Sequence, residues 1–243
     1  MTGEGLIRDE FLTEFKIESK IFDKRTLFAI FKLIKKGIIK SVEGVVKEGK
    51  ESVVVSARTK VGDWLSLKIY RVEYTDFKSM WKYLAGDPRF DHVRKNKRSV
   101  VLTWAKREFK NLKIAFDNEV CCPKPIALNE NVLVTEFIGE NGKQAPRLID
   151  VKFEDSQEVY DLIIEEMKKL AKANLIHTDL SPYNILVFNK PYLIDFSQAV
   201  TEKHPSAEEF LQRDVQNINS YFRKLNVKTD ENLFDELKKL MKL

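Results

Sequence analysis

The sequence predicts an α+β protein of two lobes, in which a half rich in β-strands precedes a mainly helical half. Three short segments rich in β-branched residues follow one another between residues 42 and 69, separated by turns that contain glycine. From residue 156 onward, apolar residues recur mainly at helical spacing. We expect a helical extension over 1–40, an N-terminal lobe that ends in a hinge over 41–138, and a C-terminal lobe over 139–243.

The extension contains one strongly predicted helix, from Asp23 to Lys36, after a charged segment over residues 6–17. Its apolar residues recur with a period that fits one buried helix face. Asp23 can cap the first turn, and Gly37 provides a stop. We therefore expect this helix to precede the β-rich lobe directly.

The N-terminal lobe is predicted to hold five strands and two helices. The first three strands are joined by tight turns, which is typical of an antiparallel meander. A charge-rich segment with weak periodicity separates the two helices and is expected to be a loop. In chain order, the predicted elements are strands 42–46, 52–57 and 64–69, helix 75–84, loop 86–98, helix 100–118, and strands 125–128 and 131–137.

The C-terminal lobe is predicted to be helical except for one small hairpin. A buried helix is expected over 156–174, because apolar residues recur there every three or four positions. Two short strands, 185–188 and 192–194, flank the turn Asn189-Lys190. Two further helices, over 206–225 and from 231 to the end, complete the lobe.

Composition limits the function classes. The chain has 42 basic and 37 acidic residues, so its net charge of +5 is too small for a dedicated nucleic-acid binder. Basic residues concentrate in Lys32–Lys40 and in Arg89–Arg107. These two clusters are either solvated surface or a site that contacts RNA. No stretch of about 20 apolar residues and no secretory h-region is present. We expect a cytoplasmic protein without a membrane partner.

The two cysteines, Cys121 and Cys122, are adjacent. Neighbouring residues seldom form a disulfide with each other, and the spacing of a zinc site is absent. We expect reduced, partly buried thiols.

A run of polar residues in the second half has the pattern of a phosphotransfer site. His177, Asp179 and Asn184 show the spacing H-x-D-x-x-x-x-N, and sixteen residues after Asp179 a short apolar strand ends in Asp195. Transfer of a γ-phosphoryl group requires an aligned acceptor oxygen and a metal held between phosphates. We predict that Asp179 and Asp195 are catalytic, and that Asn184 and Asp195 bind the metal.

The matching cation lies in the N-terminal lobe. Lys68 stands on a predicted strand and shares a face with Ser66 and Tyr70. Glu108 lies on the apolar side of the helix 100–118, and a buried glutamate is usually paired. We therefore predict that Glu108 pairs with Lys68 and that Lys68 binds the phosphates of a nucleotide.

The turn between the first two strands contains Gly49, Lys50 and Ser52. It can wrap phosphates through backbone N–H groups and a hydroxyl, although neither G-x-G-x-x-G nor a P-loop pattern is present. The order of these features is that of the protein-kinase fold. We predict that fold, with a five-stranded antiparallel N-lobe and a truncated, mainly helical C-lobe.

Several motifs together resemble the RIO family of atypical protein kinases, in the archaeal form of its Rio-one branch, over about Ile21 to Phe222. The resemblance rests on Leu-Lys-Ile-Tyr-Arg, Trp-Ala-x-x-Glu-Phe-x-Asn-Leu, Glu-Phe-Ile-Gly, His-x-Asp-Leu-Ser-x-Tyr-Asn-Ile-Leu, Ile-Asp-Phe-Ser-Gln-Ala-Val and His-Pro-x-Ala-x-x-Phe-Leu-x-Arg-Asp-Val, among others. Three positions depart from the family pattern: Thr178, Pro182 and Gln144.

The resemblance implies roles for single residues and for the whole protein. It implies that ATP and Mg²⁺, or Mn²⁺, are the cofactors, with adenine at the backbone of the hinge residues Glu136 and Ile138. It also implies an aspartyl-phosphate on Asp195, autophosphorylation or ATPase activity, and a role in maturation of the small ribosomal subunit. The partners would be that precursor, its RNA or proteins, and the chain itself as phospho-acceptor.

The C-terminal lobe offers little room for an extended peptide. Only 48 residues follow Asp195, and they contain no A-P-E motif, where an ordinary protein kinase uses roughly a hundred or more. We infer that the acceptor is the chain itself, a special partner or water. Asp214 provides a second hypothesis, in which its carboxylate holds the backbone of the predicted catalytic loop (residues 175–186), unless it is an exposed surface group.

Two other functions stay open. A small-molecule kinase of the aminoglycoside or choline type shares the spacing around Asp179, although Ser197 and Gln198 replace the acidic residue expected for a second metal. A nucleotide-gated module that binds ribosomal RNA would use the basic stretches Lys32–Lys40 and Arg89–Arg107.

Overall fold

The computed structural model describes residues 22–72, Met80 and residues 96–241. The predicted segment 6–17, the segment 75–84 apart from Met80, and most of 86–98 lie outside these residues. The N-terminal lobe is built on a five-stranded antiparallel sheet in the order β1-β2-β3-β5-β4. Its strands are β1 Ser41–Glu48, β2 Ser52–Arg58, β3 Trp64–Tyr70, β4 Pro125–Asn129 and β5 Val132–Glu136. The predicted five-stranded antiparallel lobe is thus confirmed.

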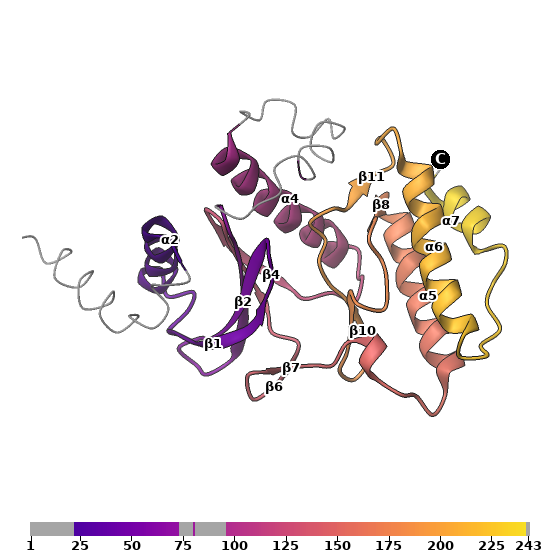
Figure 1. Cartoon of the computed structure of the whole chain (residues 1–243), viewed down its shortest axis with the longest axis horizontal. Helices are drawn as coiled ribbons and strands as arrows, with labels where there is room; N and C mark the ends of the chain where they lie inside the picture. The colour runs from indigo at the N-terminus through magenta and orange to yellow at the C-terminus, as the bar shows by residue number, and fades with distance from the viewer. Residues whose placement is uncertain (1–21, 73–79, 81–95, 242–243) are drawn as a thin grey trace, which may run out of the picture.

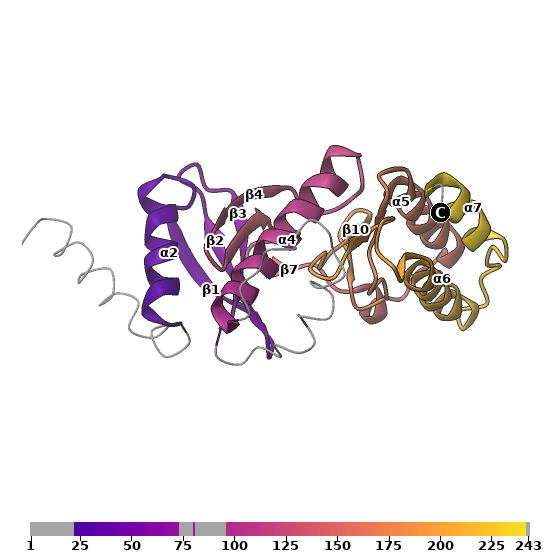
Figure 2. The ribbon, with the colours of Figure 1, turned by 90° about the horizontal axis from the view of Figure 1, so that it is seen from above.

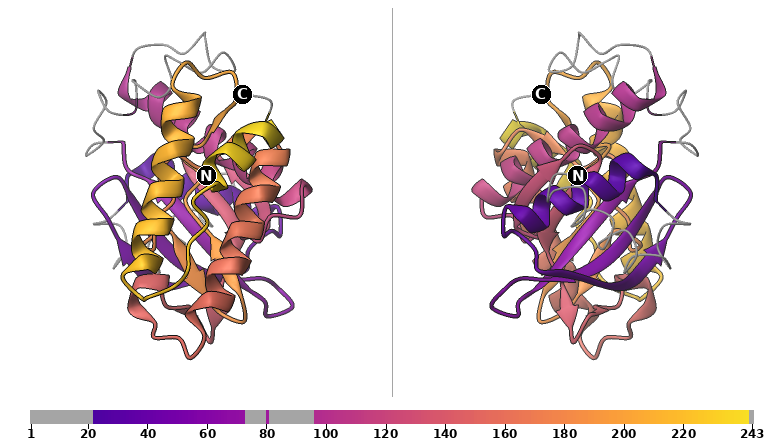
Figure 3. Two further views of the ribbon diagram at one scale, coloured as in Figure 1. Left: turned by 90° about the vertical axis from the view of Figure 1, so that its right-hand side faces the viewer. Right: turned by 90° about the vertical axis from the view of Figure 1, so that its left-hand side faces the viewer.

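Side-chain alternation divides this sheet into two different faces. Strands β2 and β3 pair so that Val55 lies opposite Leu67 and Val54 opposite Lys68. The first pair belongs to a buried apolar cluster, together with the apolar face of helix α2 (Lys24–Lys35). Asp23 caps α2 by accepting the N–H of Thr26 at 2.6 Å. Helix α2 lies across this face of the sheet, so the extension shares a core with the lobe (Figure 3).

Helix α4 (Lys97–Asp117) covers the other side of the sheet, and it starts three residues before the predicted helix. Asn96 caps it by accepting the N–H of Ser99 at 2.9 Å. The helix packs through Trp104 and Ala105 against Tyr70 of β3. It extends from the sheet towards the C-terminal lobe (Figure 2), so it can carry contacts between the two lobes.

The C-terminal lobe packs α5 (Ser156–Lys172), α6 (Ala207–Arg223) and α7 (Leu233–Met241) around one large apolar core. In Figure 1 these helices stand on the side of the molecule opposite α2. Short strands and one 3-10 turn lie between them and the sheet. They are β6 Gly139–Glu140, β7 Lys143–Gln144, η2 Leu148–Asp150, β8 Leu175–Ile176, β9 Ile185–Val187, β10 Pro191–Leu193 and β11 Val200–Thr201. The sequence predicted only β9 and β10.

Cys121 and Cys122 are free, buried thiols, as expected. No helix of the described residues is long and apolar enough to cross a bilayer.

Candidate active site

A pocket opens between the face of the sheet opposite α2 and the short strands of the C-terminal lobe. Strand β3 contributes Ser66 and Lys68, and α4 contributes Glu108. The other residues that line the pocket are Lys47, Gly49, Ser52, Val54, Leu112, Pro123, Leu133, Thr135, Glu136, Ile138, Gln144, Asn184, Leu186, Ile194 and Asp195. Most of the predicted site residues therefore meet in one pocket.

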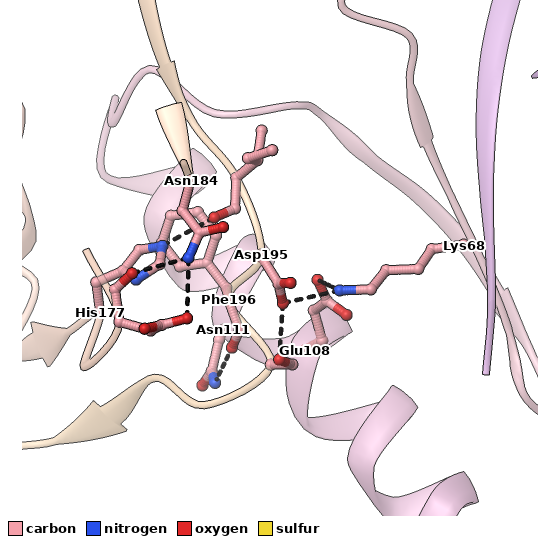
Figure 4. Close-up of polar contacts among 10 residues, drawn as sticks. Lys68, Glu108, Asn111, His177, Asn184, Asp195 and Phe196 are labelled. Atoms are coloured by element: carbon pink, nitrogen blue, oxygen red, sulfur yellow. Dashed lines mark hydrogen bonds and ion pairs between the residues drawn. The ribbon is translucent and has the colours of Figure 1, made fainter. Parts of the chain in front are cut away.

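Lys68 is the electrostatic centre of this pocket. Its Nζ lies 2.9 Å from Oε1 of Glu108 and 2.8 Å from Oδ1 of Asp195 (Figure 4). Burial by itself would lower the pKa of Lys68, but Asp195 and Glu108 together raise it above its ordinary value, so the lysine is a cation. The predicted Lys68–Glu108 pair is present, and the contact with Asp195 adds a second carboxylate.

The two carboxylates respond differently to the same lysine. Glu108 is almost fully buried, and its burial raises its pKa to about 7, which Lys68 only partly counteracts. The side chain of Asp195 is 41% exposed. Burial of the Asp195 carboxyl would raise its pKa, but Lys68 and the hydroxyl of Ser197 hold it below its ordinary value. Asp195 is thus an accessible anion at the mouth of the pocket.

Asp179 and Asn184 form the second part of the site. The Nδ2 group of Asn184 donates to the backbone oxygen of Asp179 at 2.8 Å and to its Oδ2 at 2.9 Å. Asp179 is exposed and does not line the pocket itself. This geometry places one carboxylate at the rim, where an acceptor can reach it, and leaves the amide oxygen of Asn184 available.

The catalytic loop is held from behind by helix α6. Asp214, which is buried, accepts the N–H groups of Thr178 and Leu180 at 2.7 and 2.9 Å. This is the arrangement that the sequence suggested for Asp214. Arg213 and Asn217 donate to the carbonyl oxygens of Thr178 and Leu180, and sequence reasoning did not identify Asn217.

Two residues of this site have a left-handed backbone. Thr178 has φ 70° and Asp195 has φ 65°. Such conformations cost about 1–3 kcal/mol for residues other than glycine, and they persist where the surroundings fix them. Here the fixing contacts are those of Asp214 with the Thr178 N–H and of Ser197 with the Asp195 carboxylate.

His177 has a structural role in the described site. Its ring is buried, lies 2.9 Å from the carbonyl oxygen of Ile194 through Nε2, and packs 4.8 Å from the ring of Phe196. Burial lowers its pKa, so the imidazole is neutral. His177 therefore joins the catalytic loop to the segment that carries Asp195.

The turn between β1 and β2 fits its predicted role only in part. Gly49 and Ser52 line the pocket, whereas Lys50 is exposed and does not. The N–H of Gly49 donates to the carbonyl oxygen of Ser52 at 2.9 Å. This N–H closes the turn, so Ser52 remains the best candidate among the three predicted phosphate-binding residues.

The segment after β5 has the form of a hinge. Glu136 and Ile138 line the pocket, as does Gln144. The hairpin β6–β7 follows, and the N–H of Ala145 donates to the carbonyl oxygen of Ile138 at 3.0 Å. Gly142 at the turn of the hairpin lies against the ring of Trp64 on β3. The hinge is therefore fixed to the sheet.

The donor set of Asn184 and Asp195 fits Mg²⁺, which binds through one or two carboxylate or amide oxygens together with phosphate and water. No group of three or more His, Cys, Asp or Glu side chains in the described part of the chain could hold a metal alone. Phosphate oxygens would have to complete such a site.

The comparisons with known proteins agree with this geometry. A family model described as the RIO domain matches residues 53–234. A RIO-type serine/threonine-protein kinase Rio1 of Methanocaldococcus jannaschii is 43% identical over 221 residues, which are 90% of this chain and 75% of that protein. The corresponding Rio1 of Haloferax volcanii is 41% identical over 89% of this chain and 75% of its own length.

More distant proteins show the same likeness. The human serine/threonine-protein kinase RIO1 is 38% identical over 86% of this chain, which spans only 38% of the human protein. A Rio2 kinase from Chaetomium thermophilum, solved as an ADP/Mg²⁺-phosphoaspartate complex, superposes with a TM-score of 0.70 at 25% identity. The match covers 88% of this chain and 65% of that one. The chain therefore belongs to the RIO family of serine/threonine kinases, in its Rio1 branch.

Proposed function

We propose that the chain transfers the γ-phosphoryl group of ATP, as an atypical kinase that phosphorylates itself or a protein partner, or that hydrolyses ATP. The observation that carries the proposal is the position of Lys68, whose Nζ contacts both Glu108 and Asp195 inside the pocket. A half-buried lysine on a central strand, held between two carboxylates, is the cation that kinases use on the α- and β-phosphates.

The other residues have complementary roles in this proposal. The backbone of Glu136 and Ile138 would bind adenine, and Asn184 and Asp195 would hold Mg²⁺, or Mn²⁺, against the phosphates. The metal would neutralise charge on the transferred group. Asp179, exposed at the rim and oriented by Asn184, would accept the proton of the acceptor hydroxyl or water.

Asp195 can also be the acceptor itself. Its low pKa and its exposed carboxylate make it an available nucleophile. The phosphoaspartate in the Rio2 complex supports this possibility for the present chain.

The test is incubation of the purified protein with γ-labelled ATP and Mg²⁺, with both labelled protein and free phosphate followed. Asp179→Ala and Asp195→Ala are expected to abolish labelling and phosphate release, while Lys113→Ala, an exposed change on α4, retains both. Label that hydroxylamine releases would identify an acyl phosphate. Equal activity in all three variants would contradict the proposal.

We further propose that a precursor of the small ribosomal subunit, in the cytoplasm, is the partner, and that RNA contact involves α2. Lys32, Lys35, Lys36 and Lys40 are all exposed there, and the exposed ring of Phe28 stacks on Phe31 at 6.3 Å. In the second basic stretch, Arg107 is fully buried and so is not available to RNA. Changing these four lysines to glutamate should weaken RNA binding and its dependence on salt; unchanged binding would contradict the α2 contact.

A small-molecule kinase is less well supported. The three Rio1 relatives described above are all named serine/threonine-protein kinases. In addition, Ser197 stands where a second metal would need a carboxylate ligand. Its hydroxyl instead donates to Oδ1 of Asp195 at 2.7 Å.

A further inference from the structure

Helix α4 presents three buried polar residues to the site, and Glu108 is only one of them. Arg107 and Asn111 are both fully buried. Asn111 follows Arg107 by four positions and Glu108 by three, so its side chain is a neighbour of both on the helix surface. Glu108 contacts the lysine on β3, whereas Arg107 and Asn111 face the C-terminal lobe.

The contacts of these two residues converge on the four residues that follow Asp195. The Nδ2 group of Asn111 donates to the carbonyl oxygens of Phe196 and Ala199 at 2.9 and 2.8 Å (Figure 4 shows Asn111 beside Phe196). Arg107 donates through Nη2 to those of Gln198 and Ala199, both at 3.1 Å, and through Nε to that of Ala199 at 3.3 Å. Three carbonyl groups of one turn are thus bound by one helix.

Burying a guanidinium group destabilises the fold unless its N–H groups form well-directed hydrogen bonds. Removing such a cation from water costs several kcal/mol, and the contacts of Arg107 include neutral carbonyl oxygens and the ring of Trp104, 5.4 Å away. The planar guanidinium of arginine donates from several nitrogens in fixed directions, whereas the ammonium group of lysine is a rotatable point charge. The side chain therefore fixes the direction of the turn as well as its distance from α4.

The same turn is tied to the catalytic loop. Val200, directly after it, pairs with Ile176 in the ladder of β11 and β8, and Ile176 directly precedes His177. At its other end, Ser197 donates to the carboxylate of Asp195. The turn thus lies between the metal-binding carboxylate, the catalytic loop and α4.

We propose that Arg107 and Asn111 are positioning residues that brace the turn 196–199 against α4 and so set the direction of the Asp195 carboxylate relative to Lys68. The inference rests on the proposed function, because it takes Asp195 as the metal ligand. One rigid helix then holds both the Lys68–Glu108 pair and the metal-binding carboxylate. The brace acts through Asp195 and touches neither nucleotide nor acceptor.

The test measures ADP binding by calorimetry at a series of Mg²⁺ concentrations. Arg107→Met and Asn111→Leu keep much of the side-chain volume but cannot donate to the turn. Each is expected to raise the Mg²⁺ concentration needed for half-maximal enhancement of ADP affinity by about tenfold or more, as loss of an outer support does at metal sites. ADP affinity without Mg²⁺ should change less than twofold. Arg107→Lys, which keeps the charge, should lie between wild type and Arg107→Met.

Controls separate a brace from a general loss of structure. Lys113→Ala, on the exposed side of α4, should match the wild type throughout. If the variants only melt earlier, with an unchanged Mg²⁺ dependence, or if ADP affinity falls equally without Mg²⁺, the proposal is wrong. Should Arg107→Met not fold, Arg107→Lys and Asn111→Leu decide the question.

Failure of the proposed function can be recognised separately. A wild-type protein that binds no ADP with Mg²⁺ overturns that function. The brace is then judged by hydrogen exchange of the amides of residues 196–200, which Arg107→Lys and Asn111→Leu should accelerate and Lys113→Ala should not. Equal protection in all three variants would overturn the brace.

Discussion

The carboxylate of Asp214 accepts the backbone N–H of Thr178 at 2.7 Å, although Thr178 has a left-handed backbone with φ 70°. The other oxygen accepts the N–H of Leu180 at 2.9 Å, so one carboxylate holds both neighbours of Asp179. Helix α6 therefore determines where the carboxylate of Asp179 lies, and the strain at Thr178 is held by the hydrogen bond from its own N–H to the buried Asp214.

Asp214→Asn should weaken the two hydrogen bonds to Thr178 and Leu180 while it keeps the size of the side chain. An asparagine keeps one acceptor oxygen but turns an NH₂ group towards a backbone donor. We expect the free energy of unfolding to fall by about 1–3 kcal/mol and kcat to fall by about 10- to 100-fold, with a smaller change in KM for ATP. Urea unfolding and steady-state kinetics measure both. Glu209→Gln, on the exposed side of α6, is the matched control. If Asp214→Asn behaved like Glu209→Gln, the supporting role of Asp214 would be excluded.

The stability contributed by Asp214 should depend on pH. Burial raises the pKa of Asp214 to about 7, against the two backbone N–H groups that lower it, from an ordinary value of 3.8. The folded protein thus holds this proton more tightly than the unfolded chain. The corresponding stabilisation is complete below pH 3.8 and is lost as the pH rises through about 7. The cost of Asp214→Asn should therefore be smaller at pH 8 than at pH 5, with a gradient of up to about 1.4 kcal/mol per pH unit.

Urea titrations of both proteins at the two pH values measure this difference. For Glu209→Gln the cost should be the same at pH 5 and pH 8. A cost of Asp214→Asn that is the same at pH 5 and pH 8 would show that the carboxylate is ionised throughout this range and that its hydrogen bonds outweigh its burial.

Gly139→Ala should disrupt the hinge hairpin. Gly139 has φ 148°, and a Cβ atom there would lie 2.2 Å from the carbonyl oxygen of Lys143 and 2.8 Å from the backbone nitrogen of Ala145. We expect a loss of about 1–3 kcal/mol in unfolding free energy and weaker binding of ADP, because Ile138 is adjacent. Calorimetry and urea unfolding provide the measurements.

Gly44→Ala is the control for this change, since a Cβ atom at Gly44 would meet no atom within 4 Å. It should leave ADP affinity and stability close to those of the wild type. Wild-type behaviour of Gly139→Ala would mean that the hairpin can move without affecting the pocket.

The two cysteines should be unreactive in the folded protein. Burial raises the pKa of Cys121 to about 11 and that of Cys122 further, so both are neutral thiols at pH 8. Because the thiolate is the reactive form, iodoacetamide should label neither within a time that fully labels both in urea. Mass spectrometry counts the adducts. Stoichiometric labelling of the native protein would show that the segment opens readily.

The sequence by itself determined the polar residues of the site. The spacing of Asp179 and Asn184 and the strand end at Asp195 identified three residues that the fold brings together. Strand alternation oriented Lys68 towards Ser66, and helical spacing turned Glu108 inward; both line the pocket. Local periodicity suffices for such inferences, because the period of a strand or helix decides on which face a side chain lies.

Only the tertiary structure decided the contacts that hold these residues in place. Arg107 looked like part of a basic surface, because no local pattern shows that its partners include carbonyl oxygens of a turn 91 and 92 residues later. Strands β8 and β11 have two residues each and thus no period to detect. Hydrogen bonds to backbone oxygens depend on where the chain passes, and side-chain sequence does not encode that locally. The sequence therefore specified which groups are proposed to do the chemistry, and the fold specified which groups hold them there.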